Sequence, residues 1–165
     1  MTHEEIAQIP RHKVVTYARI VVDYREQKED PNRIRITAGG NLIKTDMELT
    51  TRSADVTTAK LMWNSTISTP GARYMCADVK NYYQETPMKE PEYMKIPLDR
   101  FPEHTIRQYN LREHAKGGHV YLIILRAIYS LPQAGRLAND QLKEYLEPHR
   151  YYEVDHTPGL WNHKW

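Results

Sequence analysis

Two strand-like stretches separated by a turn constrain the fold more than any other part of this sequence. Residues 13–25 (KVVTYARIVVDYR) are rich in β-branched and aromatic side chains, which favours a long strand. The polar segment EQKEDPN follows, and its Asp-Pro-Asn is typical of a turn. Residues 33–37 (RIRIT) then alternate basic and apolar, which places Arg33 and Arg35 on one face of a second strand. We therefore predict a β-hairpin that ends near the two glycines at 39–40.

The remainder of the chain mixes helical and strand-like patterns. Apolar residues at helical spacing predict helices, and short apolar or β-branched runs predict strands. ARYMCADV favours a buried strand that contains Cys76, and the nearly continuous apolar run VYLIIL favours a central strand. We expect helices at residues 55–68, 102–111 and 135–149, and strands at residues 72–79, 93–96, 120–125, 151–154 and 160–163. This mixture predicts an α+β fold with helices packed on a sheet.

Composition limits the function classes without choosing one. The 165 residues suffice for a domain with a core, and 40% apolar against 27% charged residues excludes a disordered tail. The net charge of +2 permits nucleic-acid binding only through a local basic groove. The 12 tyrosines against one phenylalanine suit either contacts with bases or half-buried strand positions.

Cellular location follows from three absences in the sequence. A single cysteine excludes an intrachain disulfide, and no apolar run is long enough to span a membrane. Residues 1–10 lack the apolar core of a signal peptide, and we expect residues 1–12 to form an N-terminal tail. An intracellular protein without membrane contact is therefore expected.

Two single residues are candidates for chemistry. Asp78 follows an apolar strand and precedes the polar run KNYYQET, which is a normal position for a magnesium ligand, although also for a turn former or a cap. Gln133 lies in SLPQAGRLAND, where backbone amides and a side-chain amide meet at the start of a helix. Such a place binds an anion or a nucleotide, but a plain loop before a helix gives the same pattern.

The predicted hairpin carries the third candidate feature, a set of basic side chains. These arginines can line a groove for phosphates. They can equally form a solvated strand face that is neutralised by Asp23 and Glu26. The four residues are Arg19, Arg25, Arg33 and Arg35.

The order of these features is more specific than any one of them. Four motifs and a final HTPGLW follow one another in a fixed order: the first motif belongs to the basic hairpin, and the helix expected at 55–68 separates it from the other three. The four motifs are RIRITAGG at 33–40, DVKNYY at 78–83, EYMKIP at 92–97 and IYSLPQAG at 128–135. Together they resemble the reverse transcriptase of LTR retrotransposons, nearest to the copia type, from residue 17 to the end of the chain. The resemblance implies partial fingers and palm: a β-hairpin plus a sheet with packed helices.

The resemblance implies nucleotidyl transfer with two magnesium ions, and Asp78 is the first metal-binding carboxylate. The backbone carbonyl of Val79 completes part of the metal shell. Such chemistry needs further carboxylates from an Asp-Asp hairpin, and the 165 residues contain no Asp-Asp. We therefore expect residues 13–165 to be a reverse transcriptase domain truncated before that hairpin and inactive alone.

The resemblance also assigns the substrate contacts. Tyr83, five residues after Asp78, is the steric gate that excludes a 2′-hydroxyl. Gln133 contacts the incoming deoxynucleoside triphosphate, and Arg35 binds the triphosphate with Arg33 or a partner across the hairpin. Arg19 and Arg25 are those partners and contact nucleic acid, with the inward-pointing arginines set by hairpin register.

Two positions of the chain differ from the pattern of the family that it resembles. Ser130 and Arg150 stand where the family has glycine, so strained backbone angles are expected there. The partners implied are an RNA/DNA primer–template and dNTPs, in the cytoplasm or a virus-like particle. The alternative function is a non-catalytic nucleic-acid-binding remnant. A truncated sheet also predicts self-association through an exposed apolar edge, at residues 120–125 or 72–79.

Overall fold

The chain forms two compact units in the computed structural model. Unit 1 comprises Met1–Met47 and Tyr83–Ala134, and unit 2 comprises Glu48–Tyr82 and Gly135–Trp165. The predicted α+β class is confirmed, because both helices and strands are present, with a four-stranded mixed sheet and a separate two-stranded sheet. The residues that the structure describes are 1–27, 29–49, 54–77, 79–157 and 159–164.

Unit 1 is built on the four-stranded sheet, in the order β2-β1-β3-β4. β1 pairs antiparallel with β2 and parallel with β3, and β3 pairs antiparallel with β4. The predicted hairpin is therefore confirmed, and the strand expected at 93–96 is longer than predicted. The strands are β1 (Val15–Tyr24), β2 (Asn32–Ala38), β3 (Pro87–Pro97) and β4 (His119–Arg126).

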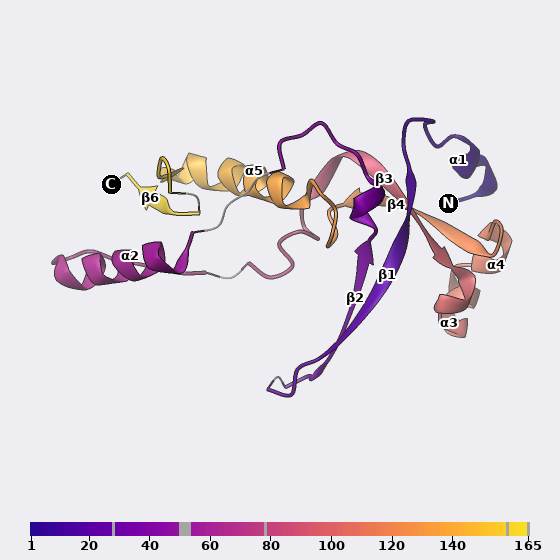
Figure 1. Ribbon diagram of the computed structural model, residues 1–165, viewed down its shortest axis with the longest axis horizontal. Coiled ribbons are helices and arrows are strands. Elements are labelled where there is room, and N and C mark those ends of the chain that lie inside the picture. Colours follow the sequence, from indigo (N-terminus) through magenta and orange to yellow (C-terminus); the bar gives the residue numbers. More distant parts are fainter. Residues whose placement is uncertain (28, 50–53, 78, 158, 165) are drawn as a thin grey trace. The chain divides into compact units, whose positions relative to one another are not determined.

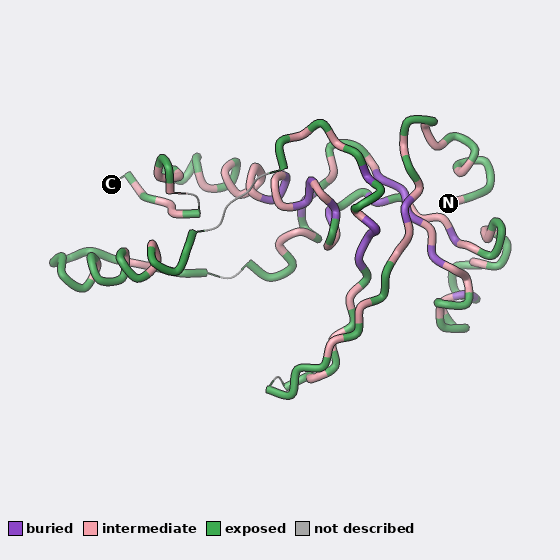
Figure 2. The backbone as a smooth tube through the Cα atoms, viewed as in Figure 1, coloured by how far each residue is buried: buried purple, intermediate pink, exposed green. Residues whose placement is uncertain are grey.

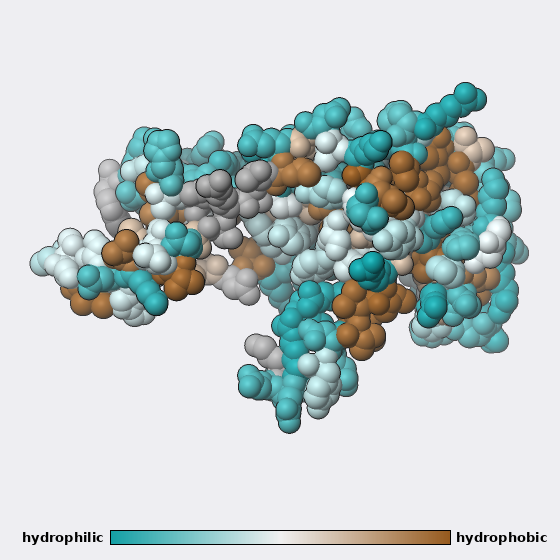
Figure 3. Space-filling view, viewed as in Figure 1, coloured by the Kyte–Doolittle hydropathy of each residue, from teal (hydrophilic) through white to brown (hydrophobic). Residues whose placement is uncertain are grey.

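The β1–β2 hairpin projects from the sheet as a long twisted ribbon (Figure 1). Its register pairs Ile20 with Ile36 and Val22 with Ile34, and directly opposed residues share a face. These side chains are exposed, Val22 to 71% and Ile34 to 69%. Figure 3 shows hydrophobic residues along one side of the ribbon and hydrophilic residues along the other. The hairpin therefore has one apolar and one charged face.

The core of unit 1 lies where β1, β3 and β4 meet, and Figure 2 shows the buried residues gathered there. Thr16 is fully buried in β1, and its hydroxyl donates to the carbonyl of Gly39 over 2.6 Å, which satisfies a polar group that burial would otherwise penalise. The apolar cluster joins strand residues to the loop after β4. Its buried members are Ala38, Ile43, Met94, Ile96, Ile124, Ala127, Leu131 and Ala134.

The strand β4 differs from its prediction. The apolar run at 120–125 does form a strand, but in the four-stranded sheet β4 pairs only with β3 and lies at the edge. Ile123 is 43% exposed and Leu125 is 61% exposed. The prediction of a central strand was wrong, because an apolar run shows that a strand is partly buried but not how many neighbours it pairs with.

Short helices complete unit 1. Residues 1–12 contain α1 (His3–Ala7), which begins at a capping box formed by Thr2 and Glu5. The helix predicted at 102–111 is confirmed as α3 (Glu103–Gln108), which α4 (Leu111–His114) follows. Two 3-10 turns, η1 (Gly40–Leu42) and η2 (Leu98–Arg100), follow β2 and β3.

Unit 2 contains the two longest helices, and both were predicted. α2 (Val56–Ser68) begins at Asp55, whose carboxylate accepts a hydrogen bond from the Thr58 amide over 2.7 Å. α5 (Ala134–Leu146) has its first residue in unit 1 and runs into the 3-10 turn η3 (Glu147–His149). The predicted strands near the C-terminus are confirmed as the antiparallel pair β5 (Tyr151–Glu153) and β6 (Trp161–His163).

The buried strand predicted at 72–79 is wrong for its described residues. Residues 72–77 are neither helix nor strand, Met75 is 81% exposed, and Cys76 is exposed rather than buried. A strand lowers its free energy by pairing with neighbours, and no described strand pairs with this segment. The apolar pattern alone therefore did not suffice.

None of the helices in the described part of the chain combines the length and the hydrophobicity that crossing a lipid bilayer requires.

Candidate functional site

The register of the hairpin settles which arginines share a face. Arg19 lies opposite Thr37, Arg35 lies opposite Val21, and Arg33 lies opposite Asp23. Because opposed residues point to the same side, Arg19, Arg33 and Arg35 all lie on the charged face. Arg19 is exposed, whereas Arg33 and Arg35 are half-buried. This face was predicted, but its register was not.

Asp23 partly neutralises the charged face. Its Oδ2 accepts a hydrogen bond from Arg25 Nε over 2.9 Å and lies 3.6 Å from Arg35 Nη2. The hydrogen bond from Arg25, together with the positive charges of Arg25, Arg35 and Arg33, lowers the pKa of Asp23. The alternative of a neutralised strand face therefore holds for Arg25, while Arg35 has a longer contact and keeps other donors.

The turn that leads to Gln133 is fastened to the end of β2. The amide of Ala38 donates to the carbonyl of Tyr129 over 3.1 Å. A Cβ atom at Gly40 would lie 1.8 Å from the carbonyl oxygen of Ser130, so only glycine permits this close approach. Ser130 has a φ of 73°, in the left-handed region, which confirms the strained backbone angle predicted at this position.

Tyr129 is the centre at which two predicted nucleotide-binding residues meet. The guanidinium carbon of Arg35 lies 5.7 Å from the centroid of the Tyr129 ring, within the range of a cation–π interaction. The ring of Tyr83 meets the same ring edge-on, with 5.6 Å between centroids and an interplanar angle of 87°. One aromatic ring therefore joins a side chain from the hairpin to one from the segment before β3.

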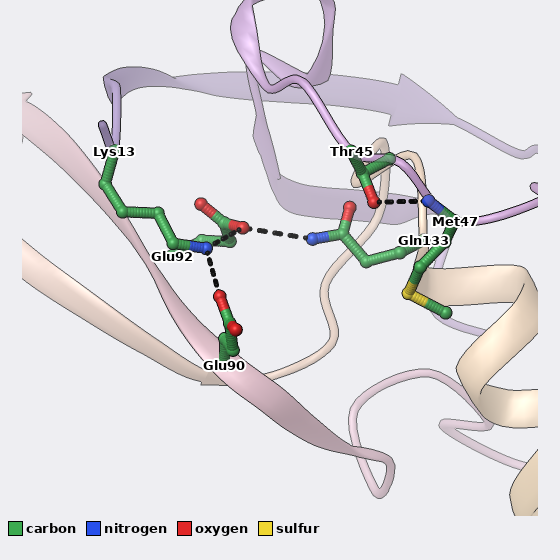
Figure 4. Close-up of polar contacts among 6 residues, drawn as sticks. All are labelled: Lys13, Thr45, Met47, Glu90, Glu92 and Gln133. Carbon is green, nitrogen blue, oxygen red and sulfur yellow. Dashed lines mark hydrogen bonds and ion pairs between the residues drawn. The ribbon is translucent and has the colours of Figure 1, made fainter.

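Gln133 is buried four residues beyond Tyr129 and is 4% exposed. Its Nε2 donates to Oε1 of Glu92 over 3.3 Å, and Lys13 Nζ lies 3.0 Å from the same oxygen. Figure 4 shows Lys13 and Gln133 reaching Glu92 from different sides. The adjoining amide of Ala134 is occupied by the carbonyl of Leu131, 3.2 Å away. The Ala134 amide is therefore already paired, and Gln133 is held to Glu92 through its side chain.

Two buried polar atoms of unit 1 have no hydrogen-bond partner among the described residues. They are Nε of Arg35, a donor, and Oε1 of Gln133, an acceptor. Unpaired buried polar groups cost about 1–3 kcal/mol each, and in folded proteins they mark strain, a functional role, or a place where a water, an ion or a ligand supplies the partner. Unit 1 therefore offers one cationic donor and one neutral acceptor.

Of the two predicted metal ligands, only Val79 lies among the residues that the structure describes. Asp78 lies outside the described residues, and Val79 is 52% exposed. Within the described ranges, no three His, Cys, Asp or Glu side chains gather closely enough to hold a metal ion. The roles of Asp78 and Val79 remain predictions.

Sequence reasoning did not identify three residues of this region, namely Tyr129, Lys13 and Glu92. Tyr129 lies in the quoted motif IYSLPQAG, and its position before the turn was the only available signal. Glu92 is a carboxylate in the middle of β3, where a buried charge needs a partner. That partner, Lys13, is 79 residues away in the sequence, so the pair becomes visible only in the fold.

No protein-family model matches the chain, and neither a curated protein nor a solved structure matches it.

Proposed function

We propose that this chain is the nucleotide-binding part of a retrotransposon reverse transcriptase, formed by the fingers and the first part of the palm. The observation that carries the proposal is the meeting of Arg35 and Tyr83 at the ring of Tyr129. Gln133, the third substrate contact that the resemblance implies, is buried in the same unit with an unpaired carbonyl oxygen. Arg35 and Tyr83, which come from separate motifs, thus lie against one ring, and Gln133 lies in the same unit.

The substrate in this proposal is a deoxynucleoside triphosphate that pairs with an RNA or DNA template. Arg35 supplies charge-assisted hydrogen bonds to phosphate oxygens. Tyr83 excludes a ribose 2′-hydroxyl by the bulk of its ring. Arg19 is exposed on the same face as Arg35 and contacts the phosphates of the primer–template.

Magnesium enters the proposal only through Asp78 and Val79. A carboxylate and a backbone carbonyl are oxygen donors of the kind that Mg²⁺ prefers. Two-ion nucleotidyl transfer needs more carboxylates, and the family supplies them from an Asp-Asp pair that does not occur in these 165 residues. We therefore propose that the chain by itself binds nucleotide and primer–template without extending the primer.

A non-catalytic nucleic-acid-binding module is the second candidate. It is favoured by the charged face of the hairpin, since the strand register places Arg19, Arg33 and Arg35 on one face. Figure 1 shows that this hairpin is a projecting ribbon. Such a ribbon can hold single strands through phosphate contacts alone, in an intracellular setting. This reading requires no nucleotide at Gln133.

Self-association is a further part of the proposal. The outer side of β4 is not paired in the described sheet, and it carries the exposed side chains of Ile123 and Leu125. An apolar strand with a free edge is a template for pairing with another chain. Elution as a monomer from a size-exclusion column at tens of micromolar protein would count against it.

Calorimetric titration of the full chain with dTTP and with UTP, both with magnesium, tests the proposed function. We expect dTTP to bind more tightly than UTP, and Tyr83→Val to reduce this preference. Arg35→Gln should weaken dTTP binding about tenfold or more, because it removes a charge-assisted hydrogen bond worth about 1.5–3 kcal/mol. Arg107→Gln is the matched control, since Arg107 is an exposed arginine of unit 1 that pairs with Glu103.

Two outcomes separate the candidates. Binding of a labelled oligonucleotide with a steep salt dependence, without dTTP binding, would favour the nucleic-acid-binding module. Equal effects of Arg35→Gln and Arg107→Gln on dTTP affinity would contradict the role of Arg35 in either reading.

A further inference from the structure

A buried carboxylate in β3 has no role in the function proposed so far. The Glu92 side chain is only 6% exposed, and burying a charge is unfavourable unless the charge is paired. Its Oε1 receives two donors, Lys13 Nζ at 3.0 Å and Gln133 Nε2 at 3.3 Å. Lys13 is itself largely buried, and it also binds Glu90 Oε2 at 3.0 Å. The buried charge of Glu92 is therefore paired, at a place that contacts the predicted substrate residue.

The chemistry of this cluster fixes the orientation of the Gln133 amide. A carboxylate only accepts hydrogen bonds, so the group of Gln133 that faces Glu92 must be the NH₂. The carbonyl oxygen is consequently turned away from Glu92, as Figure 4 shows. That oxygen is the buried acceptor left without a partner among the described residues.

We propose that Glu92, held in place by Lys13, is a positioning residue that presents the carbonyl oxygen of Gln133 to the ligand. The group recognised at Gln133 is then a hydrogen-bond donor, a hydroxyl or an N–H, and not a phosphate oxygen. This inference rests on the proposed nucleotide-binding function and names the part of the nucleotide that Gln133 reads.

The two unpaired atoms of unit 1 suit different chemical groups of the ligand. Nε of Arg35 can only donate, and its guanidinium is cationic, so it suits phosphate. Oε1 of Gln133 can only accept, and the Glu92 carboxylate behind the amide disfavours a second negative charge there. The nucleoside, rather than the triphosphate, should therefore depend on Glu92.

The chain offers a matched pair of substitutions to test this. Glu92→Gln removes the charge and lets the Gln133 amide adopt both orientations. Glu90→Gln is the control, because Glu90 binds the same lysine from the same strand but is 73% exposed and lies outside the contacts of Gln133. The two probes, titrated by calorimetry, are dTTP and inorganic tripolyphosphate, which carries no hydroxyl or N–H of a nucleoside.

We expect Glu92→Gln to weaken dTTP binding about three- to tenfold, the effect of one neutral hydrogen bond, and to leave tripolyphosphate binding unchanged. Glu90→Gln should change neither. In a Gln133→Met background, Glu92→Gln should have no further effect on dTTP, because its action passes through Gln133. Equal weakening of both probes, or an undiminished effect in the Gln133→Met background, would overturn the proposal.

A second measurement keeps the inference testable without nucleotide binding. The side-chain NH₂ of Gln133 should exchange slowly with solvent in NMR spectra, and Glu92→Gln but not Glu90→Gln should accelerate the exchange. If dTTP does not bind while this NMR result holds, the proposed function fails and the positioning by Glu92 stands. If Glu92→Gln does not fold, Gln133→Met alone should still weaken dTTP and spare tripolyphosphate. If Glu92→Gln leaves the exchange rate of the Gln133 NH₂ unchanged, the positioning role of Glu92 is refuted.

Discussion

Unit 1 and unit 2 stabilise their secondary structure in different ways. The strands of unit 1 share an apolar cluster that reaches from β2 to the loop after β4. Among the described residues of unit 2 only Leu137 and Ala138 are buried, and α2 has no buried residue. Unit 2 relies instead on local devices, such as the Asp55 cap and the ion pair between Lys143 and Glu153. Burial of an apolar cluster thus supports unit 1, whereas the described part of unit 2 depends mainly on local caps and ion pairs.

The largest expected effect comes from removing the same side chain in each unit. Ile96 is 4% exposed in unit 1, and Ile67 is 73% exposed in unit 2. Ile96→Ala should lower the free energy of unfolding by about 2–5 kcal/mol, because it leaves a cavity in a packed core. Ile67→Ala should change it by less than about 0.5 kcal/mol. Urea unfolding of both variants, followed by circular dichroism, measures the difference.

Tryptophan fluorescence sharpens this test. Trp63, Trp161 and Trp165 all belong to unit 2, so that their emission reports this unit alone. If the units unfold separately, Ile96→Ala leaves the fluorescence transition in place. A shift of that transition together with the circular dichroism would show that the two units unfold as one, and would break the comparison.

A second prediction tests the close approach that shapes the turn before Gln133. Gly40→Ala places a methyl group 1.8 Å from the backbone oxygen of Ser130, and backbone cannot rotate away as a side chain can. We expect a loss of about 1–3 kcal/mol, as for overpacking elsewhere. Gly71→Ala in unit 2 is the control for sterics, because a Cβ there meets nothing within 4 Å. The control retains a backbone cost, since Gly71 has a φ of 76°.

Thermal unfolding of Gly40→Ala and Gly71→Ala measures the two losses of stability. A smaller loss for Gly40→Ala than for Gly71→Ala would mean that the loop moves away from β2 at little cost. The dTTP affinity of Gly40→Ala should fall as well, because the same loop carries Tyr129 and Gln133.

The sequence predicted the elements that depend on a local pattern. It did not predict those features that depend on a partner distant in the sequence. The hairpin and α2 follow from alternation, turn residues and a cap, all of which are read within a short window. The stretches at 120–125 and 72–77 were both predicted to be buried strands, yet one is an edge strand and the other is exposed and irregular. Pairing partners, which no local pattern reveals, make that difference.

The candidate site shows the same division. Arg35, Tyr83 and Gln133 came from ordered motifs, whereas the ring of Tyr129 that joins Arg35 to Tyr83 did not. The pairing of Lys13 with Glu92 depends on β1 and β3 lying side by side, and the sequence offered no means to predict that neighbour. Strain at Ser130 was predictable only because the family resemblance marks a glycine there.

A third prediction concerns pH, because the interactions of the Glu153 carboxylate that stabilise unit 2 should weaken in acid. Burial by itself raises the pKa of Glu153, but the hydrogen bonds from Lys143 and the Gly159 amide outweigh it and lower the pKa. Because the folded-state pKa is below the unfolded one, this stabilisation is present at neutral pH and is lost as the pH falls through the folded-state pKa. We expect β5 and β6 to lose about 0.5–1 kcal/mol.

Hydrogen exchange at the amides of β5 and β6, compared between neutral and acidic pH after correction for the intrinsic rate, measures this loss. Glu153→Gln should weaken protection at neutral pH and remove most of its dependence on pH. The same acid sensitivity in Glu153→Gln would assign the effect to another carboxylate.

The smallest expected effect is a gain of stability, and it can be sought in both units at once. Ser130 in unit 1 and Arg150 in unit 2 have φ values of 73° and 65°, a region that costs residues with a side chain about 1–2 kcal/mol. Glycine removes this strain but loses more entropy on folding, so Ser130→Gly and Arg150→Gly should each add about 0.5 kcal/mol. Circular dichroism and tryptophan fluorescence, applied to both variants, show in which unit each gain of stability occurs. With independent units, only Arg150→Gly raises the fluorescence midpoint; if Ser130→Gly raises it equally, the core of unit 1 also supports unit 2.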